Sequence, residues 1–149
     1  MDQEYEVSRA FEVTTSIDRP VDRVWSRLTD WPHASEWMSG VESVRADDGT
    51  AVGATLTFRA RGKDRRSEIT ALEPGRSIAL TSVQGGVRAD YIYTCVPAGE
   101  GTRVRLVADC HTSGAWRLAG RLIRAAIRRA DSGQLEALKR VLEAGSGRD

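Results

Sequence analysis

Residues 87–111, VRADYIYTCVPAGEGTRVRLVADCH, contain two alternating segments on either side of a glycine-rich turn. In both segments most apolar side chains occupy every second position, which is typical of strands with one face against a core. Two such strands joined by a short turn form an antiparallel hairpin. We therefore predict a hairpin whose turn is centred on Gly99 and Glu100.

The register of this hairpin determines which side chains share a face. On one face the predicted cross-strand pairs are apolar: Tyr91–Ala108, Tyr93–Leu106, Cys95–Val104 and Ala89–Cys110. The pairs on the other face are mostly polar: Arg88–His111, Thr94–Arg105 and Val96–Arg103. A shift by one residue would mix the two faces, so the alternation fixes the parity of the register.

Five more alternating segments precede the hairpin, at residues 6–17, 41–46, 54–60, 67–72 and 77–83. Turn residues such as Asp48-Gly49, Pro74-Gly75 and Gly85-Gly86 separate the later ones, and we interpret the polar residues 61–66 as another turn. Successive strands joined by tight turns indicate an antiparallel meander. The chain is therefore expected to form a seven-stranded antiparallel sheet.

Helical periodicity replaces the alternation in two regions. Residues 18–30 place apolar side chains at helical spacing after Pro20, and Pro32 opens a second short helix that ends near Trp37. After Ser113-Gly114 a single apolar stripe, which includes Leu122, Ala126 and Leu135, predicts a C-terminal helix of about thirty residues. Gly120 and Gly133 are positions where this helix could bend.

The order of these elements resembles the START-like helix-grip superfamily (SRPBCC), in particular its bacterial polyketide cyclase/dehydrase-type branch. The resemblance rests on five segments that span nearly the whole chain: IDRPVDRVWSRLTDWPHASEW at 17–37, VGATLTF at 52–58, ALEPGRSIAL at 71–80, TCVPAGEGTRVRL at 94–106 and LEALKRVLE at 135–143. It implies an α+β fold in which the sheet wraps around the long C-terminal helix and leaves a cavity. Relatives use this cavity to bind lipids, sterols, polyketides or other apolar molecules, and a few catalyse cyclisation or dehydration there.

Length and charge agree with one domain over residues 1–149. A chain of 149 residues is long enough for a core without disulfides or metals. Residues 1–50 hold 11 acidic and 5 basic residues, and residues 51–149 hold 10 acidic and 17 basic ones. The near-neutral total argues against nucleic-acid binding.

The acidic start MDQEYEVSRAF is unlike a signal peptide, and no apolar run is long enough to span a membrane, so a cytoplasmic location is expected.

Several kinds of site find no support in the sequence. The two histidines, His33 and His111, belong to no metal-binding pattern, and neither a nucleophile elbow nor a phosphate-binding loop is present. No cofactor is therefore expected. In the predicted register, Cys95 and Cys110 lie about 20 Å apart along the hairpin, too far for a disulfide.

Two charged arrangements have both a structural and a functional interpretation. Asp90 and Asp109 are opposed in the hairpin, but on its polar outer face, where arginines can neutralise them; we interpret them as structural. The stripe of Arg117, Arg121, Arg124 and Arg128 could contact an anionic lipid surface transiently. We favour the alternative, in which it complements the acidic N-terminal half.

The three clustered tryptophans receive different interpretations. Trp25 belongs to the apolar face of the first helix and is expected in the core. Trp31 lies at the break before Pro32, where it either covers the joint or stays partly exposed. Trp37 ends the second helix, and the resemblance places it near one end of the cavity.

We predict that the protein binds a small apolar ligand between the sheet and the C-terminal helix. Tyr91 and Tyr93 would orient the polar part of the ligand or remain ordinary core residues. The candidate contacts are Trp37, Met38, Phe58, Tyr91, Tyr93, Leu106, Ala108, Leu122 and Ala126. The alternatives are a polyketide cyclase/dehydratase in the same cavity and a protein-interaction module with a filled core. Because the tyrosines and thiols are the only inward titratable groups found, binding ranks above catalysis.

Overall fold

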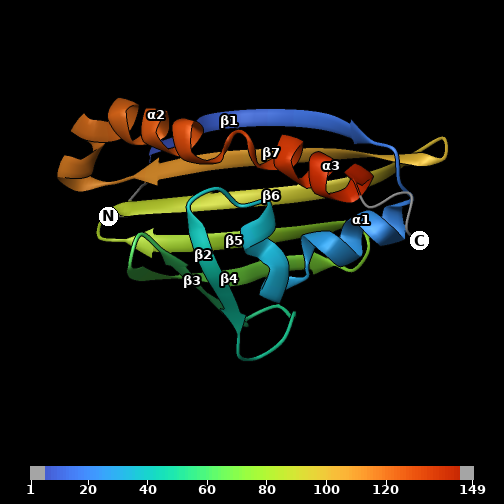
Figure 1. The fold of residues 1–149 in the computed structure, drawn as a ribbon. Coiled ribbons are helices and arrows are strands. Elements are labelled where there is room, and N and C mark those ends of the chain that lie inside the picture. Colours follow the sequence, from blue (N-terminus) through green and yellow to red (C-terminus); the bar gives the residue numbers. More distant parts are fainter. Residues whose placement is uncertain (1–5, 145–149) are drawn as a thin grey trace.

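The computed structural model describes residues 6–144, which form a curved antiparallel sheet flanked by helices (Figure 1). The strands are β1 (Glu6–Ile17), β2 (Val41–Ala46), β3 (Thr55–Ala60), β4 (Lys63–Glu73), β5 (Ser77–Gln84), β6 (Val87–Ala98) and β7 (Gly101–Thr112). The helices are α1 (Val21–Leu28), α2 (Gly120–Asp131) and α3 (Gln134–Ala144), with 3-10 helices η1 (Trp31–Glu36) and η2 (Gly114–Ala119). This is the α+β helix-grip fold predicted from the sequence.

The seven strands are arranged in the order β1-β7-β6-β5-β4-β3-β2. Six strands follow one another as a meander, and β1 completes the sheet by pairing with β7. The predicted register of the β6–β7 hairpin is confirmed: Tyr91 pairs with Ala108, and Tyr93 pairs with Leu106. Both tyrosines therefore lie on the inner, apolar face of the sheet.

The interpretation of residues 61–66 as a turn is wrong in extent. Only Arg61 and Gly62 form the turn, and their φ angles of 54° and 78° lie in the left-handed region that a tight hairpin turn requires. β4 then begins at Lys63, so Arg65 belongs to a strand and pairs with Phe58. Cross-strand hydrogen bonds outweigh the low apolar content of this segment.

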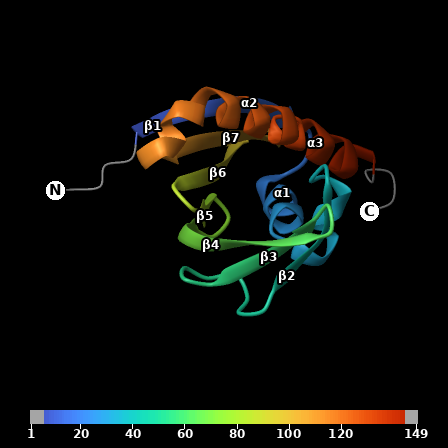
Figure 2. The same ribbon diagram turned by 90° about the vertical axis from the view of Figure 1, so that its left-hand side faces the viewer.

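The two short helices after β1 lie inside the curve of the sheet (Figure 2). α1 buries Val24 and Leu28, and Trp25 is partly buried against the core rather than fully enclosed. Trp31 is buried, and its Nε1 donates a hydrogen bond of 2.9 Å to Thr50 Oγ1. Trp37, directly after η1, is 2% exposed.

The C-terminal helical segment, residues 114–144, lies along β1 and β7 in three pieces rather than as one straight helix (Figure 2). The break between α2 and α3 falls at Ser132 and Gly133, one of the two predicted bend positions. α3 buries Leu135, Leu138 and Leu142, whereas Gly120 is the only buried residue of α2. The segment is therefore anchored mainly through α3.

Candidate ligand-binding site

Four polar side chains meet on the inner side of the sheet, beneath the break between α2 and α3. β6 supplies Tyr91 and Tyr93, α2 ends at Asp131, and Gln134 begins α3. The Tyr91 hydroxyl donates to Asp131 Oδ2, and the Tyr93 hydroxyl donates to Gln134 Oε1 at 2.6 Å. Gln134 Nε2 donates to Asp131 Oδ1 at 3.2 Å. We call this connected set the inner polar cluster.

Burial determines the protonation behaviour of the cluster. It raises the pKa of Asp131, while hydrogen bonds from Tyr91 and Gln134 and the positive charge of Arg65 act in the opposite direction. Burial, and secondarily the charge of Asp131, raise the pKa of both tyrosines, so their hydroxyls stay protonated as donors. Asp131 is therefore a half-buried carboxyl group that can take up or release a proton on the inner face.

Aromatic rings contact both tyrosines of the cluster. Phe11 meets Tyr91 edge-on with ring centroids 6.5 Å apart, and Trp37 meets Tyr93 edge-on at 6.1 Å. Within residues 6–144, the buried Trp37 Nε1 has no hydrogen-bond acceptor. An unpaired buried donor is unfavourable by about 1–3 kcal/mol. The apolar surroundings of the cluster thus contain one donor that could meet an oxygen of a bound molecule.

Most of the predicted contact residues lie inside the protein. Trp37, Met38, Tyr93, Leu106 and Ala108 are buried. Phe58 and Tyr91 are partly buried and pack against the core. These seven lie on the inner side of the fold, and Tyr91 and Tyr93 among them belong to the inner polar cluster.

The expected inward orientation of Leu122 and Ala126 is wrong. Leu122 is 75% exposed, and Ala126 is also exposed. The broad apolar stripe left the orientation of α2 open, and the helix instead turns Ile123, Ile127 and Asp131 toward the protein. The partly buried Ile127 packs against the core in their place.

Asp131 and Gln134 are absent from the predicted contacts. The signal for Asp131 is present in the spacing, because Ile127, Asp131 and Leu135 stand four residues apart and share one helix face. A carboxylate within an apolar stripe indicates either a break or a polar site. Asp131 has both properties, because it ends α2 and belongs to the inner polar cluster.

Two open surface depressions lie away from the inner polar cluster. One, of about 370 Å³, lies beside the end of β1 and the β6–β7 turn, and the other, of about 280 Å³, lies beside α1. Neither is lined by any of the nine predicted contact residues. They are therefore not the cavity that the sequence predicts.

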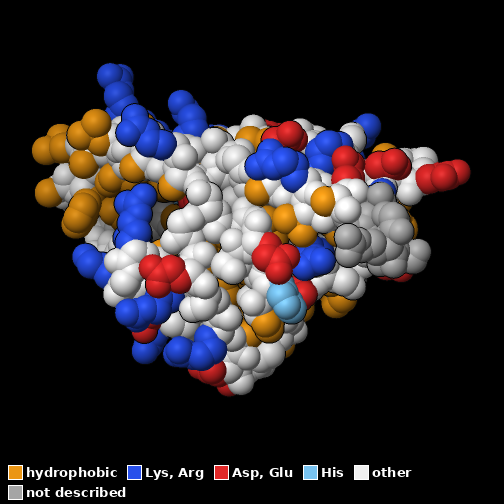
Figure 3. Space-filling model, in the orientation of Figure 1, with side chains coloured by type: hydrophobic (Ala, Val, Ile, Leu, Met, Phe, Trp, Pro, Cys, Tyr) orange, Lys and Arg blue, Asp and Glu red, His pale blue; other side chains and the backbone are white. Residues whose placement is uncertain are grey.

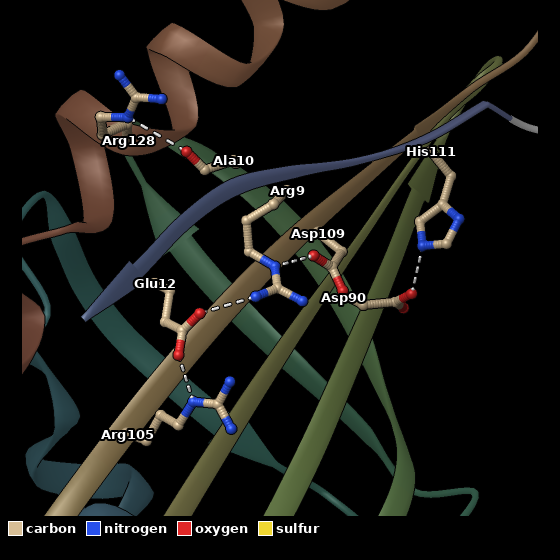
Figure 4. Close-up of polar contacts among 8 residues, drawn as sticks. All are labelled: Arg9, Ala10, Glu12, Asp90, Arg105, Asp109, His111 and Arg128. Atoms are coloured by element: carbon tan, nitrogen blue, oxygen red, sulfur yellow. Dashed lines mark hydrogen bonds and ion pairs between the residues drawn. The ribbon is translucent and has the colours of Figure 1, made fainter. Parts of the chain in front are cut away.

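The outer face of the sheet carries a separate network of charges (Figure 4). Asp90 and Asp109 are opposed, as predicted, and each is neutralised by an arginine. The ion pairs are Arg9–Asp109 and Arg9–Glu12 at 2.8 Å, Arg105–Glu12 at 2.6 Å, Arg88–Asp90 at 3.3 Å and His111–Asp90 at 2.8 Å. This arrangement supports the structural interpretation of the two aspartates.

The remaining sequence candidates have structural roles or none. Cys95 and Cys110 are buried free thiols, and burial raises the pKa of Cys95 to about 11, so this thiol is a poor nucleophile. Over residues 6–144 no group of His, Cys, Asp and Glu side chains is arranged to hold a metal ion. In the same range, no helix is both long and apolar enough to cross a membrane.

Comparison with known proteins agrees with this architecture. The family model described as "Polyketide cyclase / dehydrase and lipid transport" matches residues 8–143. Among curated proteins, no sequence matches the chain.

Several solved structures share the fold. The Zhui aromatase/cyclase from a Streptomyces species is 19% identical with a TM-score of 0.76, and the match covers 95% of this chain and 96% of that one. Truncated norcoclaurine synthase from Thalictrum flavum is 14% identical with a TM-score of 0.70, covering 95% and 98%. A protein of unknown function from Staphylococcus aureus is 11% identical with a TM-score of 0.76, covering 99% and 100%. At these identities the likeness shows the fold alone.

Proposed function

Because the chain belongs to the polyketide cyclase/dehydrase and lipid-transport family, we propose that it binds a small, mainly apolar molecule between the inner face of the sheet and the C-terminal helical segment. The observation that carries the proposal is the inner polar cluster within apolar surroundings. Ligand sites commonly combine apolar walls with a few convergent polar groups. Apolar burial would supply most of the affinity, at about 25 cal/mol per Å².

The polar groups favour a ligand that carries an oxygen acceptor. Both tyrosine hydroxyls already donate within the inner polar cluster. The Trp37 indole N–H, beside Tyr93, has no acceptor within the described residues. A carbonyl or ether oxygen would satisfy it. We expect α2 to move aside for ligand entry, because Gly120 is its only buried residue and Gly133 adjoins its C-terminal end.

Native mass spectrometry of the purified protein tests this proposal. We expect a retained small apolar molecule, and binding of a dansyl-labelled fatty acid to protein freed of it. Trp37→Phe removes the donor but keeps most of the ring, and it should weaken binding about five- to tenfold, the value of one hydrogen bond. Trp25→Phe, in the partly buried face of α1, is the matched control and should bind normally. Failure of the wild type to bind any apolar molecule would contradict the proposal.

A second candidate, cyclase chemistry in the same place, is favoured by Asp131. A carboxylate whose pKa is raised by burial is a stronger base than an exposed one, and it could remove a proton from the carbon between two carbonyl groups of a polyketide. Activity would then be lost as pH falls through the raised pKa of Asp131. Asp131→Asn should abolish turnover of a poly-β-ketone substrate while leaving binding intact. Equal turnover by this variant and the wild type would remove Asp131 from the mechanism.

A further inference from the structure

One end of the molecule exposes large apolar side chains that the proposed ligand site does not use. Trp116 is 49% exposed, Leu118 93% and Leu122 75%. All three lie in the seven-residue segment 116–122, which covers the second half of η2 and the start of α2. We call them the η2–α2 patch. In Figure 3, hydrophobic side chains gather at the left-hand end, where Figure 1 places this part of the chain. Clustered exposed apolar side chains of this size indicate a contact surface.

The same segment carries positive charge that the fold leaves uncompensated. Residues 114–130 contain five arginines and no acidic residue. Within residues 6–144 none of the five forms an ion pair, although Arg128 Nε donates to the Ala10 carbonyl oxygen at 3.2 Å. On the outer face of the sheet, by contrast, Arg9, Arg88 and Arg105 are all paired. The expected complement between the arginine stripe and the acidic N-terminal half is therefore not formed as ion pairs.

We propose that the η2–α2 patch docks on an anionic lipid bilayer. Tryptophan and leucine suit the boundary between headgroups and acyl chains, and arginine suits lipid phosphates. A second copy of this chain would place its own arginines against these arginines. A nucleic acid would neutralise the arginines but leave Leu118 and Leu122 without apolar contacts. A negatively charged bilayer satisfies both components of the surface at once.

The docked surface is independent of the ligand site in its residues but continuous with it in the chain. α2 begins at the η2–α2 patch and ends at Asp131 of the inner polar cluster. A bilayer contact would therefore bind the start of α2, the helix that is proposed to move when the ligand enters. Failure of docking would leave the ligand proposal untouched, because the two tests measure different residues.

Co-sedimentation with vesicles tests the docking. The full chain is mixed with vesicles of phosphatidylcholine alone and of phosphatidylcholine with phosphatidylglycerol. We expect binding to the anionic vesicles only, with a blue shift of tryptophan emission. Trp116→Phe should abolish this shift, because Trp31 and Trp37 are buried and the partly buried Trp25 belongs to α1, outside the patch.

Paired variants separate the apolar from the electrostatic contribution. Leu118→Ser with Leu122→Ser should weaken binding about tenfold or more, and Arg117→Gln with Arg121→Gln about fivefold for each charge removed. Val52→Ser, at a 62% exposed valine elsewhere, and Arg103→Gln, at an exposed arginine of β7, are the matched controls and should bind as the wild type does.

Three outcomes would overturn the proposal. The wild type fails to bind anionic vesicles at low salt, or the leucine variants bind as tightly as the wild type. Alternatively, the wild type is a dimer that the leucine variants convert to a monomer, without vesicle binding by either form; the patch would then be a contact between copies. Circular dichroism of each variant verifies that it is folded.

Discussion

Asp131 combines burial with hydrogen bonds, so its ionisation is coupled to folding. Because its pKa is raised in the folded protein, the protonated form contributes stability that is present at low pH and lost as pH rises through the raised pKa, above the usual value of 3.8. Asp131→Asn removes this titration. We expect the variant to lose less stability than the wild type as pH rises through that window, measured by urea denaturation across pH.

Asp48→Asn is the control for this experiment, because Asp48 is an exposed carboxylate in the turn after β2. It removes a carboxylate that lies outside the inner polar cluster, and its pH profile of unfolding is compared with that of Asp131→Asn. If the profiles of Asp131→Asn and the wild type coincide, burial does not control the pKa of Asp131.

Trp37 is predicted to contribute to stability as well as to binding. It is 2% exposed and packs edge-on against Tyr93, so Trp37→Ala should lower the free energy of unfolding by about 3–5 kcal/mol. Trp25→Ala should lower it by less, because the Trp25 side chain is only partly buried. Urea denaturation of the two variants checks this order. Equal losses would show that the two rings contribute alike to the core.

Residue-level prediction from the sequence succeeded where alternation has one solution and failed where a polar residue replaces an apolar one. Tyr91 and Tyr93 could be placed on the inner face because shifting the register would mix the faces. Asp131 could not be recognised as inward from composition, because charged side chains in helices are usually exposed. Its environment is created by β6, a strand distant in the sequence.

Among the elements, the joint between α2 and α3 offers a direct test at Gly133. Its φ angle is not in the left-handed region, and a Cβ atom there would meet no atom within 4 Å. Gly133→Ala should therefore raise the free energy of unfolding by about 0.4–1 kcal/mol by restricting the unfolded chain. If α2 must move for ligand entry, the same variant should also slow uptake of the dansyl-labelled fatty acid.

Gly101→Ala provides the contrast. A Cβ atom at Gly101 would lie 2.7 Å from the Ile17 carbonyl oxygen, so strain should lower the free energy of unfolding by about 1–3 kcal/mol. Thermal denaturation of both variants measures the difference. Destabilisation by Gly133→Ala would indicate that the joint needs the conformational freedom of glycine.

The elements differ in how far local sequence determines them. Turn residues and alternation predicted all seven strands in their order along the chain. The start of β4 was not predicted, because charged residues such as Lys63 and Arg65 have low strand propensity. The long C-terminal helix was predicted from its stripe. Both glycines predicted as possible bend positions lie at junctions between its pieces: η2 changes to α2 at Gly120, and Gly133 separates α2 from α3.

At the scale of the whole molecule, burial is concentrated in the sheet and α3 rather than in α2. Seven of the twelve residues of β7 are buried, whereas α2 has one buried residue, Gly120. Amides of α2 should therefore exchange with deuterium much faster than those of β6 and β7. Hydrogen-exchange mass spectrometry measures this order. Protection of α2 equal to that of β7 would contradict movement of α2 during ligand entry.

The pairing of β1 with β7 joins the first and the last strand along the chain. Ile17 pairs with Thr102 and Phe11 with Ala108, whereas every other strand pair joins neighbours in the chain. Closing so long a loop is entropically unfavourable, which makes this contact slow to form. During synthesis on the ribosome, β1 cannot form its hydrogen bonds with β7 until β7 has been synthesised. The first strand to be synthesised is thus among the last to form its hydrogen bonds in the sheet.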